Sequence, residues 1–271
     1  MQSVRRFVFI PAMTIVICLH FLVGSAAADR PLHFDYPTKL LNLETGYLLG
    51  PGGNAQIGIG ESGFGVRGRM QFTTNLLFDV LTFVNGQVKV GLLTDKDPLP
   101  ALAAGFGYYN LISSEYIIDA VVREAFTDED IDLSSELECY SFFLSISKKL
   151  HTRARVHAGY QYHYLEGFVD SDKPVNLSAE QDTVSIYLSL DQSADHHCLM
   201  MALDADLIDQ LKFLLEFGYD ISYDRGRGGV GFRLGLLQSF SLQLGILWPG
   251  VKLDEDIDIP VLPHFSMFWR F

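Results

Sequence analysis

Hydrophobic and polar residues alternate along most of the chain with a period of two. Between Arg153 and Tyr164, one set of alternate positions carries alanine, valine and tyrosine, and the other carries arginine, histidine, glycine and glutamine. Successive side chains of a β-strand point to opposite faces, so this pattern predicts a strand with one apolar and one polar face. Similar patterns cover 54–72, 75–84, 87–93, 100–109, 137–147, 182–191, 213–220, 230–236 and 240–248.

Turn signals separate these segments and predict an all-β, up-and-down antiparallel sheet. They are Gly50–Asn54, the hairpin dipeptide Asn85-Gly86, Asp95–Pro98 and Tyr223–Gly226. Such a sheet can close as a soluble barrel with apolar residues inside, or as a membrane barrel with apolar residues toward lipid. Two features favour the membrane barrel. The polar set of alternate positions is rich in glycine, serine and arginine, and aromatic residues lie near the strand ends, namely Tyr162, Tyr164, Tyr219, Trp248 and Trp269.

The last strand carries a resemblance to a known class. Phe265, Met267, Trp269 and the final residue Phe271 share one parity. This arrangement resembles the C-terminal β-signal of bacterial outer-membrane β-barrel proteins. The resemblance implies a transmembrane barrel in the outer membrane, inserted by the barrel-assembly machinery through its C-terminal strand. Its surroundings would then be outer-membrane lipid and lipopolysaccharide.

The first 28 residues are predicted to be a secretory signal peptide. Arg5 and Arg6 precede an apolar core over 7–23, and Ser25–Ala28 supplies small residues before a cleavage site. Residues 29–271 are then one barrel domain. The chain holds 33 acidic against 20 basic residues, which argues against a nucleic-acid partner.

Strand number follows from the requirement that bacterial barrels have an even count and short periplasmic turns. Accepting every segment gives fourteen strands but puts the long connections 110–136 and 165–181 in the periplasm. Twelve strands result if 54–72 is one long strand with a bulge at Gly60–Gly63, and if 192–210 is a periplasmic excursion, for which a short helix over 197–209 is one alternative. We prefer twelve strands and keep fourteen as the alternative.

The polar parity predicts a ladder of charged residues inside the barrel. It includes Arg67, Arg69, Arg153, Arg155, His157, Glu216, Arg233 and Arg270. Buried charges must be paired or hydrated, so the ladder is either a structural set of ion pairs or the cationic wall of a pore that favours anions. Counting from the loop at 222–227 places Glu216 and Arg233 opposite each other.

Two acidic loops are nearly identical: Asp128–Leu133 and Asp254–Ile259. Alternate aspartates resemble the start of a calcium-binding loop, although the later ligands are missing. The alternatives are a solvated acidic loop and a surface site for calcium or magnesium at the lipopolysaccharide. The candidate ligands are Asp128, Asp130, Asp132, Asp254, Asp256 and Asp258.

Candidate chemistry elsewhere is sparse. Residues 113–126 have the apolar spacing of a short helix in an outer loop, which could lie on the rim or plug the barrel. Asp195-His196-His197 is a candidate acid–base or metal cluster, or else a solvated turn, expected on a periplasmic connection, and no serine-nucleophile motif is present. Cys139 and Cys198 could pair in an oxidising compartment. We therefore expect no catalytic site and no cofactor beyond surface cations.

These patterns predict an outer-membrane barrel with a polar lumen. The leading hypothesis is a passive pore or transport barrel. A closed structural or surface-interaction barrel with cation-binding loops is the alternative, and an outer-membrane enzyme is less favoured.

Overall fold

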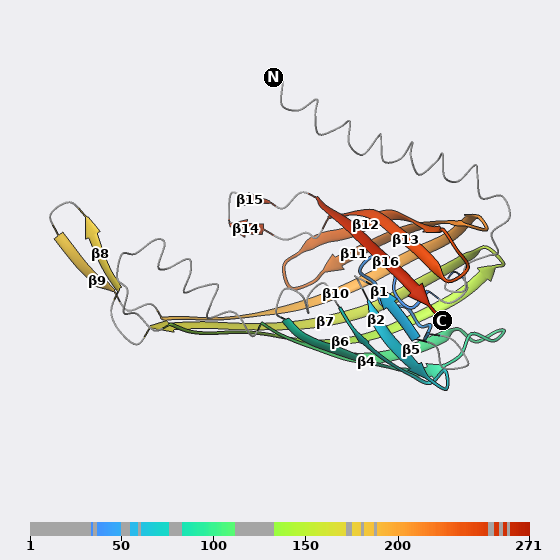
Figure 1. Cartoon of the computed structure of the whole chain (residues 1–271), viewed down its shortest axis with the longest axis horizontal. Helices are drawn as coiled ribbons and strands as arrows, with labels where there is room; N and C mark the ends of the chain where they lie inside the picture. Colours follow the sequence, from blue (N-terminus) through green and yellow to red (C-terminus); the bar gives the residue numbers. More distant parts are fainter. Residues whose placement is uncertain are drawn as a thin grey trace, which may run out of the picture.

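Twelve antiparallel strands close into a barrel in the computed structural model (Figure 1). The structure describes residues 34, 37–49, 55–58, 61–75, 83–111, 133–171, 175–179, 182–186, 189–248, 252–254, 257–258 and 261–271. In order around the barrel, the strands are β1 (Ala55–Gly58), β16 (Leu262–Arg270), β13 (Phe240–Trp248), β12 (Arg225–Gly235), β11 (Leu211–Asp220), β10 (Ser189–Ile208), β7 (Ala154–Ser171), β6 (Leu133–His151), β5 (Ala101–Leu111), β4 (Phe83–Leu93), β3 (Met70–Thr74) and β2 (Ser62–Val66).

Two small hairpins lie outside the barrel order. One joins β8 (Val175–Ala179) to β9 (Asp182–Ile186), and the other joins β14 (Lys252–Asp254) to β15 (Ile257–Asp258). The described residues include no helix with the length and apolar character of a membrane span. The predicted helix at 113–126 and the signal peptide at 1–28 fall outside the described residues.

The two ends of the barrel differ. Tight turns at 67–69, 152–153, 209–210 and 236–239 gather at the end where β16 finishes, which we call the short-turn end. The opposite, long-connection end carries the connections 75–82, 112–132, 172–188 and 249–261. Strands β6, β7 and β10, with 19, 18 and 20 residues, extend far beyond the others on the long-connection side (Figure 1).

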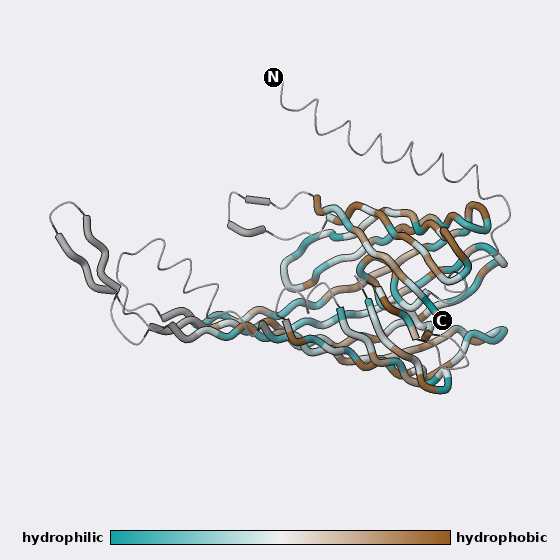
Figure 2. Tube along the Cα trace, in the orientation of Figure 1, coloured by the Kyte–Doolittle hydropathy of each residue, from teal (hydrophilic) through white to brown (hydrophobic). Residues whose placement is uncertain are grey.

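Apolar side chains face outward and polar ones face inward. On β11, Glu216 is 0% exposed while the next residue, Phe217, is 56% exposed. Brown and teal segments alternate along the strands in Figure 2. This inversion of the soluble pattern is the construction of a transmembrane barrel, which must satisfy its backbone internally and offer apolar side chains to lipid.

The strand count agrees with the prediction from the sequence, but three of the predicted assignments were wrong. Residues 54–72 are not one bulged strand: β1, β2 and β3 divide them, because β1 pairs antiparallel with β2 and Arg67-Gly68 forms a turn with positive φ before β3. Residues 192–210 are not a periplasmic excursion but most of the barrel strand β10. The Asn85-Gly86 dipeptide lies inside β4, paired with Tyr109 and Tyr108, and not in a turn.

Candidate functional site: a lumen filled by an N-terminal hairpin

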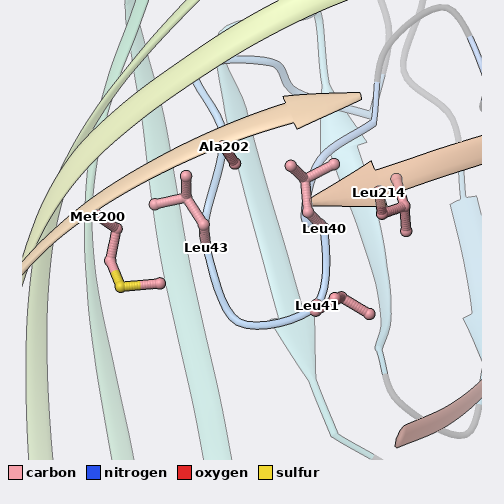
Figure 3. Packing of buried hydrophobic residues seen from close by; sticks show 6 residues of the cluster. All are labelled: Leu40, Leu41, Leu43, Met200, Ala202 and Leu214. Atoms are coloured by element: carbon pink, nitrogen blue, oxygen red, sulfur yellow. The ribbon is translucent and has the colours of Figure 1, made fainter. Parts of the chain in front are cut away.

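Residues 37–49 lie inside the barrel, and we call this segment the plug. It is a tight hairpin: Lys39 pairs with Glu44, the Leu40 amide donates to the Leu43 carbonyl at 3.1 Å, and Thr45 donates to Thr38 at 3.1 Å. The tip at Leu40–Leu43 reaches the middle of the lumen (Figure 3). The limb at 45–49 lies at the short-turn end, where Arg270 donates to the Leu49 carbonyl.

The plug tip has an apolar contact with the wall. Leu40, Leu41 and Leu43 are buried in one cluster with wall residues of β10 and β11, namely Met200, Ala202 and Leu214 (Figure 3). This contact explains why the lumen-facing parity of β10 is locally apolar. It also explains why the two-residue period of β10 was hard to recognise in the sequence.

The carboxylate of Glu216 holds the plug tip by its backbone. One of its oxygens accepts hydrogen bonds from the amides of Leu41 at 2.7 Å, Asn42 at 3.0 Å and Leu43 at 3.1 Å, and the other accepts from Asn42 at 2.9 Å. Successive amides that converge on one anion form a backbone nest. Glu216 therefore accepts the hydrogen bonds of the tip amides, and these amides stabilise its charge in the place of a basic side chain.

Wall amides and guanidinium groups satisfy the plug carbonyls. Arg233 donates to the Lys39 carbonyl at 2.9 Å, Gln243 donates to the Leu40 carbonyl at 2.9 Å, and Gln161 donates to the Asn42 carbonyl at 3.2 Å. The polar wall thus forms the hydrogen bonds that water would otherwise give the buried hairpin.

Ion pairs join one side of the plug to β4. Lys89 donates to Glu44 at 3.1 Å and to the Thr38 carbonyl at 2.7 Å, and Lys39 contacts Glu44 at 3.5 Å. Close by, Glu61 accepts from Thr38 at 3.2 Å and from Gln71 at 3.0 Å.

A second group of charges connects wall strands to one another, and we call it the wall cluster. Arg155 contacts Asp204 at 3.0 Å and Asp206 at 3.4 Å, and His157 contacts Asp204 at 2.8 Å. Lys212 pairs with both aspartates, at 2.9 Å for Asp206. The side chains of the wall cluster are completely buried, so each buried charge is stable only while its oppositely charged partners are present.

The wall cluster continues into a serine–histidine–aspartate series. Ser147 Oγ lies 2.7 Å from His157 Nδ1, whose other nitrogen contacts Asp204. Such a series can activate a serine nucleophile. Here Ser147 is 1% exposed and its Oγ accepts the Gly46 amide of the plug at 2.7 Å, so no substrate can approach it while the plug is in place.

The tight turns anchor the plug at the short-turn end. Asp95, between β4 and β5, accepts hydrogen bonds from Tyr47 at 2.8 Å, Lys148 at 2.9 Å and the Lys149 amide at 2.9 Å. Partial burial raises the pKa of Asp95, but these hydrogen bonds outweigh it and hold the pKa below its ordinary value.

The structure separates the predicted ladder into two sets. Arg155, His157, Glu216, Arg233 and Arg270 are buried in the lumen. Arg67, Arg69 and Arg153 are instead exposed at turns of the short-turn end, where strands finish and the side chains meet solvent. Arg153 forms an exposed pair with Asp209 at 3.0 Å.

The expected Glu216–Arg233 pair is also wrong. Glu216 lies opposite Gly229 and Arg233 opposite Lys212, because β12 already begins at Arg225 and the turn is shorter than predicted.

The remaining candidates are distributed as follows. Asp195, His196 and His197 lie in β10, near the long-connection end, where they contact Tyr162, Asp220 and Tyr160 respectively, and not on a periplasmic connection. Cys139 and Cys198 are both free. Asp128, Asp130, Asp132 and Asp256 fall outside the described residues, and Asp254 and Asp258 belong to β14 and β15. Within the described residues, no group of three acidic, histidine or cysteine side chains could hold a metal ion.

The plug was not predicted from the sequence. The stretch Thr38–Leu49 has neither a period of two nor a helical period, so it gave no secondary-structure signal. An indication exists only in the observed register: Glu216 then lies opposite Gly229, and a buried carboxylate without a basic cross-strand neighbour requires hydrogen-bond donors from another segment.

Several solved outer-membrane barrels share this fold loosely. The NanC porin is 9% identical, with a TM-score of 0.40 over 80% of this chain and 96% of that one. The KdgM porin is 6% identical with a TM-score of 0.31, over 81% and 97%. Ail, the attachment invasion locus protein of Yersinia pestis, is 7% identical with a TM-score of 0.27, over 81% and 98%. No family model and no curated protein matches the chain.

The fold and its lumen therefore define a class of protein: a closed twelve-strand antiparallel barrel whose outer face carries exposed apolar side chains. The resembling structures are bacterial outer-membrane β-barrels, and no particular family among them is identified. Within this class, the chain is a barrel whose lumen holds its own N-terminal hairpin.

Proposed function

We propose that the protein is an outer-membrane channel held closed by its plug. The binding of the plug tip by Glu216 carries this proposal, because hydrogen bonds form most of the polar contact between plug and wall. A hydrogen bond to a charged group such as Glu216 contributes about 1.5–3 kcal/mol, and water or a solute entering the lumen can replace it. We further propose that the short-turn end faces the periplasm and that Phe265, Met267, Trp269 and Phe271 are read by the barrel-assembly machinery.

Barrel size supports a channel. Eight-stranded barrels are filled by their own side chains, whereas barrels of 16–18 strands enclose an aqueous channel. A twelve-strand barrel lies between these sizes and needs an additional segment to close it. Withdrawal of the plug would expose a polar lumen that contains both Lys89 and Arg233 and the acidic Glu61 and Glu216.

Conductance in planar bilayers tests the proposal. The full chain should conduct rarely, and a variant lacking residues 37–49 should conduct steadily. Glu216→Gln should increase the frequency of openings. Glu138→Gln, at an outward carboxylate bound by Tyr108 and Tyr140, is the matched control and should behave as the parent. A folded deletion variant that does not conduct would contradict the channel.

A permanently closed structural barrel is the second candidate. The wall cluster favours it, because Arg155, Asp204 and Lys212 are wall residues whose ion pairs occupy part of the lumen. A non-conducting deletion variant would support this reading.

A further inference from the structure

Arg227 of β12 reaches across the lumen side of β11 to β10. It lies opposite Gly218 in the barrel register, and its Nη1 donates to Cys198 Sγ at 3.2 Å. Gly218 leaves room for this path, because a β-carbon there would lie 3.1 Å from Arg227 Cγ, closer than side chains ordinarily pack. The guanidinium group is therefore held beside Cys198, two residues nearer the long-connection end than Met200, which packs on the plug tip.

The guanidinium group of Arg227 has donors without an acceptor. Nη1 is bonded to the thiol of Cys198, but Nε is buried and has no hydrogen-bond partner. Within the part of the chain that the structure describes, Arg227 forms no ion pair. The edge that it leaves open, Nε with Nη2, is one that binds a carboxylate or phosphate through two parallel hydrogen bonds. A buried charge is costly unless it is paired, so this edge requires an anion or water.

The carboxylates of the surrounding lumen already have other partners. Asp220 lies 2.8 Å from a histidine ring nitrogen and accepts hydrogen bonds from two backbone amides of the turn that follows it, at 3.0 and 3.3 Å. Glu216 is bound by the amides of the plug tip. Glu44 pairs with two lysines, and Glu61 binds a threonine and a glutamine. A ligand at Arg227 therefore meets a guanidinium group that no described carboxylate neutralises by contact.

His163 of β7 supplies a second nitrogen donor near Arg227. It lies opposite His196, so it is a diagonal neighbour of Cys198 on the lumen face, and such neighbours are about 7–8 Å apart. No described residue forms a hydrogen bond with the His163 ring, and the charge that acts on it most strongly is that of Arg227. Both side chains are partly exposed, so a solute in the lumen can reach them.

We propose that Arg227 and His163 form a binding site for a small anion, the carboxylate or phosphate group of a solute. The anion accepts two hydrogen bonds from the open edge of Arg227 and one from the ring of His163. The site lies between the plug tip and the long-connection end, so it is filled while the plug stays in place. The closed barrel is then a receptor for anionic solutes, whether or not it conducts.

Titration of the full chain in detergent micelles tests the site. Sodium acetate or inorganic phosphate is added at constant ionic strength, and the affinity is measured from the NMR signals of the Cys198 and Gly218 amides. Both anions should shift these signals until they saturate, and acetamide, an uncharged analogue of acetate, should not. Tighter binding of phosphate would assign the site to a phosphorylated solute, and tighter binding of acetate would assign it to a carboxylate.

Variants separate this site from a general effect of charge. Arg227→Lys keeps the charge but removes the edge with two donors, so it should weaken the binding of both anions about tenfold. His163→Gln removes the ring and should weaken binding by a smaller factor. Arg153→Gln is the matched control, because Arg153 is exposed at the short-turn end and pairs with Asp209, and this variant should bind as the parent does.

Two results would overturn the proposal. One is a shift that grows linearly with anion concentration and does not saturate. The other is an unchanged affinity in the folded Arg227→Lys variant or, if that variant does not fold, in His163→Gln. Binding is measured on the closed full chain, so it does not bear on the conductance of the variant lacking 37–49. The anion site and the channel can therefore fail separately.

Discussion

The lumen contains two groups of buried charges that differ in where their partners lie. Glu216 and Lys89 direct their hydrogen bonds to the plug, and Arg233 divides its bonds between the Lys39 carbonyl and the wall residue Gln243. Arg155, Asp204 and Lys212 instead form ion pairs within the wall. Removing the plug would leave Glu216 and Lys89 without these partners, whereas the ion pairs of Arg155, Asp204 and Lys212 join wall residues only. One part of the polar lumen therefore binds a removable segment, and the other part joins wall strands to one another.

The largest effect should come from breaking the wall cluster. Asp204→Asn removes the charge shared by Arg155, His157 and Lys212. Loss of one partner of a buried ion pair costs about 3–5 kcal/mol, because the remaining charges are uncompensated. Urea unfolding in lipid should show this loss, whereas the conductance of the folded fraction should stay that of the parent. A stable Asp204→Asn variant with frequent openings would show that the two groups are not distinct.

The next largest loss of stability should come from a charge on the outer face of β11, and it tests whether that face contacts lipid. Phe217→Arg places a charge on the lipid face of β11 and should cost about 2–4 kcal/mol near the bilayer midplane. Leu237→Arg is the matched control: Leu237 is 57% exposed, similar to the 56% of Phe217, but lies in a tight turn. Equal losses in the two variants, measured by folding into vesicles, would argue that β11 does not face lipid. Gly218 is a poor control, because a side chain there meets Met200.

Loosening the plug should have a smaller effect on stability. Glu216→Gln keeps the shape of the side chain but removes the charge that binds the amides of Leu41, Asn42 and Leu43. Hydrogen bonds to a charged group contribute about 1.5–3 kcal/mol, and the amide oxygen retains part of this. We therefore expect a loss of unfolding free energy at or below this range. Hydrogen exchange should be faster at the three amides and unchanged in β6 and β7. Unaltered exchange at the plug tip would show that Glu216 does not hold it.

The lipid-facing alternation and the closed barrel could be predicted because both are local and periodic. Phe217 and Glu216 differ by one position, and that difference alone assigns them to opposite faces. The plug could not be predicted in this way, because its contacts join Leu41 to Glu216 and Lys39 to Arg233 across the whole chain. The role of β10 was missed for the same reason: Met200 and Ala202 are apolar on the lumen side because they pack on the plug.

The smallest effect should be a dependence on pH at the short-turn end. The pKa of Asp95 lies below its ordinary value in the folded chain, so its contribution is present above the unfolded pKa of about 3.9 and is lost as pH falls through the folded value. Stability measured from pH 6 down to about pH 3 should therefore fall less steeply in Asp95→Asn than in the parent. Asp97→Asn, at the exposed carboxylate beside it, is the control. Parallel curves for the parent and Asp95→Asn would contradict this anchor.

Disulfide trapping tests most directly whether the plug occupies the lumen. A β-carbon at Gly159 on β7 would lie 2.8 Å from Leu43 Cδ1, so Leu43→Cys and Gly159→Cys should form a disulfide when Cys139 and Cys198 are replaced by serine. Leu43→Cys with Gly167→Cys, farther along the same strand, is the control. The account predicts rapid oxidation of the first pair in folded, membrane-inserted protein and none of the control pair. If the first pair stays reduced, or if both pairs oxidise equally, residues 37–49 do not close the barrel.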